Sequence, residues 1–335
     1  MFIKKNREKW NAYQHERSSS PDETAERFIT LIDDLAYAKT FYPKSKVTEW
    51  INGVAAGIYQ TIYRNKKEKY NRIFRFWKYE LPLLIKKYHR LLLFTFIAFS
   101  IFVAIGVLAS IQNPEFIRDV LGNEYVDKTE ENIVKGDPFG VYKDENPFSM
   151  FVRIAFNNIG VAFKTFSGGF VLGIFTLMVL WQNGIMLGCF EYLFFSHGLG
   201  IKSIMVIWIH GTIEISSIVI AGAAGFIVAR SILFPQTYTR LESFKRGVKD
   251  AVKLLLCLIP FFIIAAFLES YITHLMSETY AKSPQSGMPV WLSALILAGS
   301  LALMVWYFIL WPNKLHKRNT AAITQDSSPV NIAHA

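Results

Sequence analysis

Three long uncharged runs of apolar residues constrain this chain more than any other feature of its sequence. They cover residues 91–111, 166–190 and 290–311, which are 21, 25 and 22 residues long. Each run is long enough to cross the roughly 30 Å hydrocarbon core of a bilayer as an α-helix. Inside that core only helices and closed barrels satisfy all their backbone hydrogen bonds. The sequence therefore predicts an all-α polytopic membrane protein, folded as a transmembrane helical bundle.

Two further segments are predicted to cross the membrane. Residues 203–229 are apolar except for His210 and Glu214, and residues 254–268 form a shorter uncharged run that ends at Glu269. Lys253 and Glu269 bound this run, and the side chain of either is long enough to extend to the membrane interface. Five apolar segments are thereby assigned to the bundle.

The distribution of charge predicts the topology. Residues 1–90 hold 19 basic and 10 acidic residues, whereas residues 112–147 hold 4 basic and 9 acidic. Residues 230–253 hold six basic residues against two acidic ones. Because basic segments stay in the cytoplasm, the first and third segments are expected inside and the acidic loop at 112–147 outside. The overall basic charge therefore reflects membrane topology, and we expect no nucleic-acid binding.

This topology requires a sixth crossing, since five would leave residues 230–253 outside. Residues 148–165 are apolar along most of their length, and Ser167-Gly168-Gly169 follows them as a turn. About six spans then place both termini in the cytoplasm. The alternative is a re-entrant helix, because Asn157 and Asn158 are costly to expose to lipid at mid-depth.

The regions outside the spans divide the chain. Residues 1–90 are predicted to form a helical cytoplasmic region, with one helix starting at Ser20-Pro21 and another at residues 45–64. Its last part, residues 70–90, mixes basic and aromatic residues as interfacial helices do. The transmembrane domain is placed at residues 91–312 and a disordered cytoplasmic tail at 313–335. No cleavable signal peptide is expected.

His210 and Glu214 are the residues most suggestive of a site. They lie four residues apart on one helix face, with Ser217 next along it, and ionisable groups inside a membrane usually face protein or water. Asn157, Asn158 and Asn183 are the expected partners in an intramembrane polar cluster, which either functions or only holds helices together. Close helix packing is expected at small residues, namely Gly169, Gly173, Gly184, Gly188, Gly222 and Gly225.

Known catalytic patterns are weak. A metal site can be drawn from Glu191, His197, His210 and Glu214, but the two-histidine pattern of zinc proteases on a helix is absent, as are a phosphate-binding loop and a Ser-His-Asp arrangement. We therefore expect no catalytic residue, no bound metal and no cofactor. Cys189 and Cys257 are expected to be buried packing residues.

Two blocks of sequence carry a family resemblance. Residues 157–188 (NNIGVAFKTFSGGFVLGIFTLMVLWQNGIMLG) and 209–225 (IHGTIEISSIVIAGAAG) resemble the core of the stage II sporulation protein M family. The resemblance covers roughly residues 85–310. It implies an integral protein of the bacterial cytoplasmic membrane that works with peptidoglycan-degrading partners and has no established enzymatic activity of its own.

Two hypotheses for function follow. The first is a non-enzymatic scaffold in cell-envelope remodelling, which contacts the lipid bilayer and recruits protein partners through its N-terminal helices and its external loop. The alternative is a transporter or ion-coupled permease in which Glu214 and His210 bind or relay a proton. The sequence leaves the oligomeric state and the identity of any partner or solute open.

Overall fold

The computed structural model describes residues 2–16, 18, 20–63, 72–140, 146–281 and 287–326, with side chains as far as residue 320. Within these ranges every regular element is helical. The chain divides into two compact units, Met1–Ile73 and Phe74–Ala335. Residues 74–90, which the sequence analysis assigned to the N-terminal region, thus belong to the second unit, called here the membrane unit.

The N-terminal unit contains three helices, α1 (Phe2–His15), α2 (Pro21–Phe41) and α3 (Lys46–Tyr63). Helix α2 starts where the sequence predicts, because the Ser20 side chain accepts a hydrogen bond from the Glu23 backbone amide at 3.1 Å. The three helices enclose a small core of their own, in which the Trp10 ring is fully buried and its Nε1 donates to Asp34 Oδ2 at 2.8 Å. The other buried core residues are Leu31, Leu35, Ala38, Ile51, Val54 and Ala55.

Short helices precede the first long helix of the membrane unit. They are α4 (Arg72–Arg75), the π-helix η1 (Phe76–Glu80) and α5 (Leu81–Lys87), and α6 (His89–Gln112) follows. The aromatic and basic residues of this segment are hydrogen-bonded to later parts of the chain: Tyr88 Oη donates to Asp250 Oδ2 at 2.9 Å, and Tyr307 Oη donates to the Trp77 carbonyl at 2.8 Å. The segment therefore packs against the bundle.

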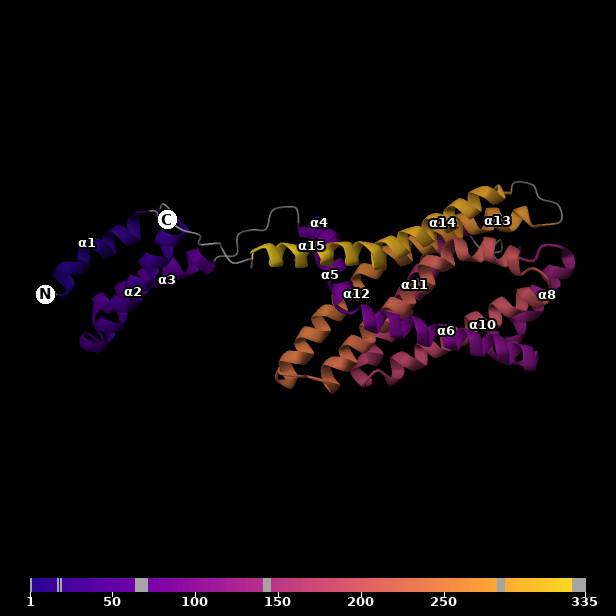
Figure 1. The fold of residues 1–335 in the computed structure, drawn as a ribbon, viewed down its shortest axis with the longest axis horizontal. Coiled ribbons are helices and arrows are strands. Elements are labelled where there is room, and N and C mark those ends of the chain that lie inside the picture. Colours follow the sequence, from indigo (N-terminus) through magenta and orange to yellow (C-terminus); the bar gives the residue numbers. More distant parts are fainter. Residues whose placement is uncertain are drawn as a thin grey trace, which may run out of the picture. The chain divides into compact units, whose positions relative to one another are not determined.

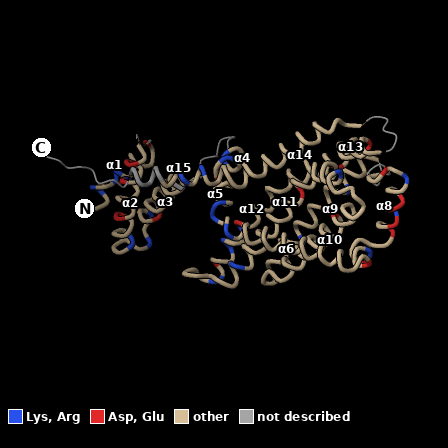
Figure 2. Tube along the Cα trace, turned by 45° about the vertical axis from the view of Figure 1, so that its right-hand side comes forward, with Lys and Arg blue, Asp and Glu red and all other residues tan. Residues whose placement is uncertain are grey.

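Six long helical segments form the membrane unit (Figures 1 and 2). After α6 come α9 (Pro147–Ser167), α10 (Ile174–Ser196) and α11 (Gly200–Leu233). Next, α12 (Arg240–Phe267) continues through the π-helix η4 (Leu268–Thr273) into α13 (His274–Thr279). The last segment runs through α14 (Val290–Val305), η5 (Trp306–Leu310) and α15 (Trp311–Asp326).

Five of these segments are long and apolar enough to cross a membrane. The exception is α9, whose composition is less apolar. At 1.5 Å per residue, its 21 residues still reach about 31 Å, the thickness of the hydrocarbon core. It is one unbroken α-helix, and the turn after it contains the 3₁₀-helix η3 (Gly168–Val171) and two residues with positive φ, Leu172 and Gly173. About six spans are thus accommodated, as the sequence predicts.

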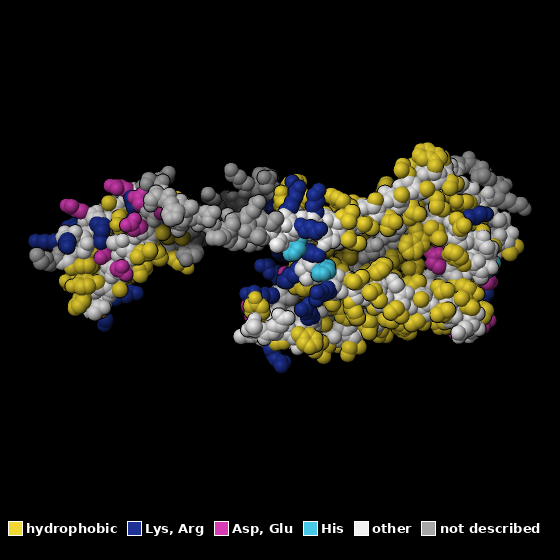
Figure 3. Space-filling view, in the orientation of Figure 1, with side chains coloured by type: hydrophobic (Ala, Val, Ile, Leu, Met, Phe, Trp, Pro, Cys, Tyr) yellow, Lys and Arg dark blue, Asp and Glu magenta, His cyan; other side chains and the backbone are white. Residues whose placement is uncertain are grey.

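Charge is segregated between the two ends of the membrane unit. Figure 3 shows Lys, Arg and His side chains gathered at one end and hydrophobic side chains over the middle. The opposite end carries acidic residues on the short helices α7 (Glu115–Leu121) and α8 (Asn123–Lys135), within the predicted external loop (Figure 2). The apolar band between the charged ends is the arrangement expected of a protein in a bilayer.

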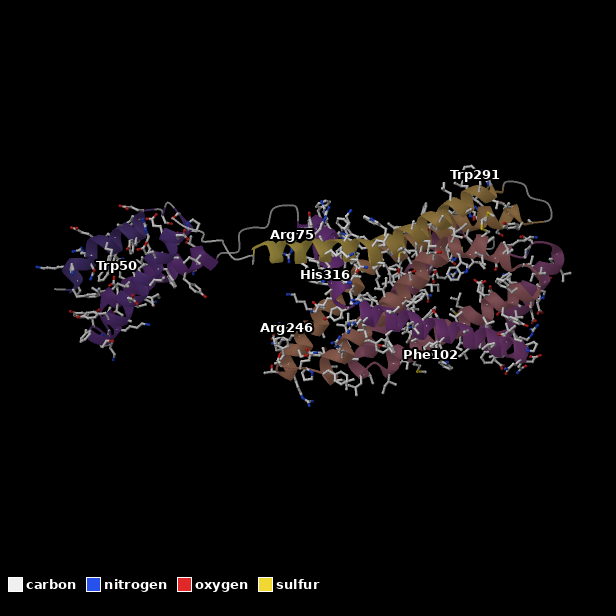
Figure 4. All side chains as sticks on the ribbon, viewed as in Figure 1. Trp50, Arg75, Phe102, Arg246, Trp291 and His316 are labelled. Carbon is white, nitrogen blue, oxygen red and sulfur yellow. The ribbon has the colours of Figure 1, made fainter. Side chains whose placement is uncertain are left out.

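Helix α11 lies at the centre of the unit and packs against α6, α9, α10, α12 and α14. Close approach of the helices requires glycine both at contacts of α11 and between α6 and α10. A Cβ on Gly169 would lie 2.2 Å from the Gly225 carbonyl oxygen, and one on Gly188 would lie 2.3 Å from the Val103 carbonyl oxygen. Phe102 on α6, labelled in Figure 4, lies against Gly184 in the same way. A Cβ on Gly222 would lie 2.8 Å from Leu180 Cδ1, and one on Gly173 would lie 3.0 Å from Phe226 Cδ1.

The C-terminal segment differs from the sequence expectation. Helix α15 extends to Asp326, although residues 313–335 were expected to be a disordered tail. Its first turns are held to the bundle, since Lys86 Nζ donates to Asn313 Oδ1 at 2.6 Å and Leu315 is buried. Residues 327–335 lie outside the described residues.

Candidate functional site

Three ionisable side chains meet inside the membrane unit. His210 and Glu214 project from the same face of α11, and Glu269 reaches them from η4. One ligand atom from each lies within 4.8 Å of the others, and His210 Nε2 is 3.9 Å from Glu269 Oε2. Glu269, for which the sequence allowed a position at the membrane interface, is thus turned toward His210. The helix continues for ten residues beyond Glu269, to Thr279, and its packing on α11 turns the carboxylate inward.

The local geometry of η4 places a second side chain beside His210. The π-helical turn covers Leu268–Thr273, and Glu269 and Thr273 both face α11 from it. His210 Nδ1 lies 2.9 Å from Thr273 Oγ1. Short π-helical turns within α-helices occur frequently at functional sites. The contacts of the His210 ring with Thr273 and Glu269 thus depend on this turn.

The hydrogen bonds of Thr273 indicate which nitrogen of the neutral His210 ring carries the proton. Thr273 Oγ1 donates its one proton to the Leu268 carbonyl oxygen at 3.2 Å. It can therefore only accept from His210, so Nδ1 carries the ring proton. In the neutral ring Nε2 then bears a lone pair, and this lone pair faces the Glu269 carboxylate. The tautomer is assigned here from the hydrogen-bond network.

Helix α9 contributes an asparagine pair. Asn157 Nδ2 donates to Asn158 Oδ1 at 3.3 Å, and the Asn158 side chain approaches the Glu214 carboxylate. Asn158 is only 5% exposed, and its Nδ2 has no hydrogen-bond partner of normal geometry. Arg153, on the same helix, lies close enough for its positive charge to act on Glu269. The site is thus built from α9, α11 and η4.

Two other predicted members of the cluster bond to their own helices. Asn183 Nδ2 donates to the Val179 carbonyl oxygen at 2.8 Å, and Ser217 Oγ donates to the Ile213 carbonyl oxygen at 2.7 Å. Such bonds satisfy polar side chains inside a membrane helix without a partner helix. These hydrogen bonds do not join Asn183 or Ser217 to His210 and Glu214.

The metal site drawn from the sequence is replaced by a different grouping. Glu191 accepts hydrogen bonds from Trp208 Nε1 at 2.7 Å and from Ser203 Oγ at 3.3 Å. His197 Nδ1 lies 2.8 Å from the Leu193 carbonyl oxygen. Within the described residues, Glu269 takes the place of these two beside His210 and Glu214. The apolar residues after Glu269, such as Ile272 and Leu275, were the sequence signal that its helix continues.

Comparison with known proteins places this site in a family. Residues 93–274, more than half of the chain, match the stage II sporulation protein M family, and every residue of the site lies within that range. The chain belongs to this family. The resemblance seen in the two sequence blocks is thereby confirmed, and the chain is a multi-pass membrane protein.

Other comparisons are more limited. Residues 1–64 match a separate family described as a domain of unknown function (DUF8413). An uncharacterized protein from Methanocaldococcus jannaschii is 31% identical over 125 residues, which are 37% of this chain and 70% of that protein. No solved structure matches the chain. The stage II sporulation protein M match and the N-terminal match do not overlap, in agreement with the two structural units.

Proposed function

We propose that this chain is a non-enzymatic membrane scaffold that recruits partner proteins in cell-envelope remodelling. One observation carries the proposal: a separately folded helical domain, with its own core and its own family match, is joined to a stage II sporulation protein M membrane unit. A domain outside the spans adds binding surface without adding to the bundle. The lipid bilayer and envelope proteins are then the partners.

The surface of the N-terminal unit supports this role. Ile29, Tyr37 and Phe41 lie at spacings of eight and four residues on α2, so they share one face of the helix. They are 62%, 43% and 62% exposed. Contiguous apolar surface on a domain outside the membrane commonly marks a protein interaction site. We propose that this face of α2, defined by Ile29, Tyr37 and Phe41, binds the partner.

The topology follows from the charged ends of the membrane unit. We place the basic end, with α5 and the start of α12, in the cytoplasm, and the acidic helices α7 and α8 outside. Both termini are then cytoplasmic and the membrane is the cytoplasmic membrane. The N-terminal unit would recruit cytoplasmic partners, and α7 and α8 would face partners outside.

Crosslinked affinity purification from native membranes tests the proposal. The full chain should recover a defined set of envelope proteins, and the pair Ile29→Asp and Phe41→Asp should abolish recovery of the cytoplasmic ones. The pair Asn52→Asp and Ala56→Asp adds the same charge at exposed positions of α3 and serves as the control. Equal recovery by both double variants would refute the role of this face.

A second candidate function is a cation-coupled permease. The observation in its favour is Glu269, which lies with Glu214 beside His210, so that two carboxylates and an imidazole come together. Paired ionisable residues at depth mark ion pathways in many transporters. Flux in proteoliposomes that is lost in Glu214→Gln, while the assembled variant still recovers every partner, would favour the permease over the scaffold.

A further inference from the structure

We propose that His210, Glu214 and Glu269 bind one divalent transition-metal ion, of the Zn²⁺ class, inside the membrane unit. The three ligand atoms already converge to within 4.8 Å. The proposal goes beyond the scaffold role and does not depend on it, since a bound ion can equally stabilise the bundle or take part in transport.

The first argument is the direction of the His210 lone pair. Because Nδ1 donates to Thr273 Oγ1, the neutral ring presents its Nε2 lone pair to Glu269 Oε2 at 3.9 Å. A metal ion placed between these two atoms would accept an electron pair from each of them. Metal-bound histidines almost always donate their other ring N–H to a fixed partner, as His210 does to Thr273.

The second argument is charge. Glu214 and Glu269 bring two carboxylates to one point in a largely apolar interior, where unbalanced charge is costly. Among the described residues, Arg153 acts on Glu269 with one positive charge, which does not balance two carboxylates when both are ionised. A divalent cation balances the charge of the two carboxylates and also occupies the carboxylate and imidazole lone pairs.

The third argument is an unsatisfied donor. Asn158 is 95% buried, and its side chain approaches the Glu214 carboxylate, but its Nδ2 has no hydrogen-bond partner of normal geometry. A buried donor of this kind destabilises the folded protein unless an acceptor completes its hydrogen bond. A water molecule in the fourth position of a four-coordinate ion is such an acceptor, and three protein ligands plus one water is a common zinc arrangement.

The ligand set indicates the class of metal. One imidazole nitrogen and two carboxylates suit Zn²⁺, Mn²⁺ and Fe²⁺ better than Ca²⁺ or Mg²⁺, which prefer oxygen alone, or Cu⁺, which prefers sulfur. Bonds of about 2.1 Å at tetrahedral angles place ligand atoms about 3.4 Å apart. The ligands must therefore close by roughly 1 Å, and rotation of the two glutamate side chains is sufficient for this movement.

The test is metal retention by the full chain in detergent, without a histidine tag. After removal of metal and incubation with Zn²⁺ or Co²⁺, gel filtration and elemental analysis should find about one ion per chain. The Co²⁺ form should show the visible absorption of a four- or five-coordinate site. Glu214→Gln and Glu269→Gln should weaken binding at least tenfold, whereas Glu191→Gln, which alters another intramembrane carboxylate, should not.

A second pair of variants distinguishes loss of metal binding from loss of folding. Thr273→Val removes the acceptor of the His210 Nδ1 proton and should weaken binding about 10- to 100-fold, while Thr273→Ser keeps the hydroxyl and the affinity. Folding of each variant is checked by its elution volume and helical circular dichroism. The proposal is overturned if folded protein retains neither ion, or if retention is equal in the wild type, Glu269→Gln and Thr273→Val.

Discussion

At the scale of single residues, the most sharply determined positions are glycines on α11. A Cβ at Gly225 would lie 2.5 Å from Thr176 Oγ1 and 2.7 Å from the Thr165 carbonyl oxygen. A Cβ at Gly211, on the same helix, would meet only Ile207 Cγ2, at 4.0 Å. The two glycines therefore differ in packing although both lie in one long helix.

We expect Gly225→Ala to destabilise the protein by about 1–3 kcal/mol, because the added methyl group must displace atoms of α9 and α10. Gly211→Ala should be neutral or slightly stabilising, since alanine favours the helix. Thermal unfolding of the two variants in the same detergent compares them. A lower melting temperature for Gly211→Ala than for Gly225→Ala would contradict the packing described for α11.

A second prediction at the residue scale concerns Tyr88. Burial raises the pKa of its phenol, and the nearby Asp250 carboxylate raises it further. A raised pKa in the folded state favours the neutral phenol, so its contribution is complete below about pH 10 and is lost as the pH rises through the folded-state pKa. Tyr88→Phe removes the hydrogen bond to Asp250 and should cost about 1 kcal/mol near pH 8.

Melting curves of the wild type and Tyr88→Phe between pH 8 and 11 provide the measurement. The difference in melting temperature should be constant up to about pH 9 and should narrow above pH 10. A gap that widens with pH would mean that the phenol is ionised in the folded protein and that the direction of the pKa shift is wrong.

At the scale of elements, α9 decides the topology, because it is the helix whose composition leaves its crossing open. If α9 crosses, the turn between α11 and α12 lies in the cytoplasm and α8 lies outside. Both native cysteines, Cys189 and Cys257, are buried, so a single introduced cysteine can be labelled above a low background.

We expect Thr237→Cys, in the exposed turn before α12, to react with a membrane-impermeant thiol reagent only after the membrane is opened. Glu131→Cys, on α8, should react in intact cells. Reaction of both positions in intact cells would establish α9 as re-entrant and five crossings in place of six.

At the scale of the whole molecule, the two units suggest independent folding. The N-terminal unit buries Trp10 fully, together with six aliphatic residues on α2 and α3. A domain of about 60 residues has little stability to spare. Expressed alone, residues 1–64 should be soluble and helical by circular dichroism.

Trp10→Ala should unfold this isolated unit, since loss of a buried tryptophan costs about 3–5 kcal/mol. Ile29→Ala, at a position 62% exposed on α2, should leave its melting temperature almost unchanged. Cooperative folding of Trp10→Ala with the wild-type melting temperature would show that the core lies elsewhere.

The amino-acid sequence by itself determined the fold class, five apolar segments long enough to cross a membrane, the start of α2 and the shared helix face of His210 and Glu214. These follow from local properties: the length of apolar runs, the capping preference of serine and the four-residue spacing that puts two side chains on one helix face. The family followed from two blocks that are contiguous in sequence.

Only the tertiary structure decided which residues complete the site. Glu269 is 55 residues from Glu214 in the sequence, and local pattern placed it at the end of a span. Packing of α12 and η4 against α11 brought its carboxylate to His210, and η4 placed Thr273 so that it fixes the ring tautomer. The sequence assigned Asn183 to the cluster because of its residue type, but its amide donates to a carbonyl oxygen within α10. Which residues meet between two helices depends on how the helices are rotated and shifted relative to each other. The spacing of residues within one helix does not specify this.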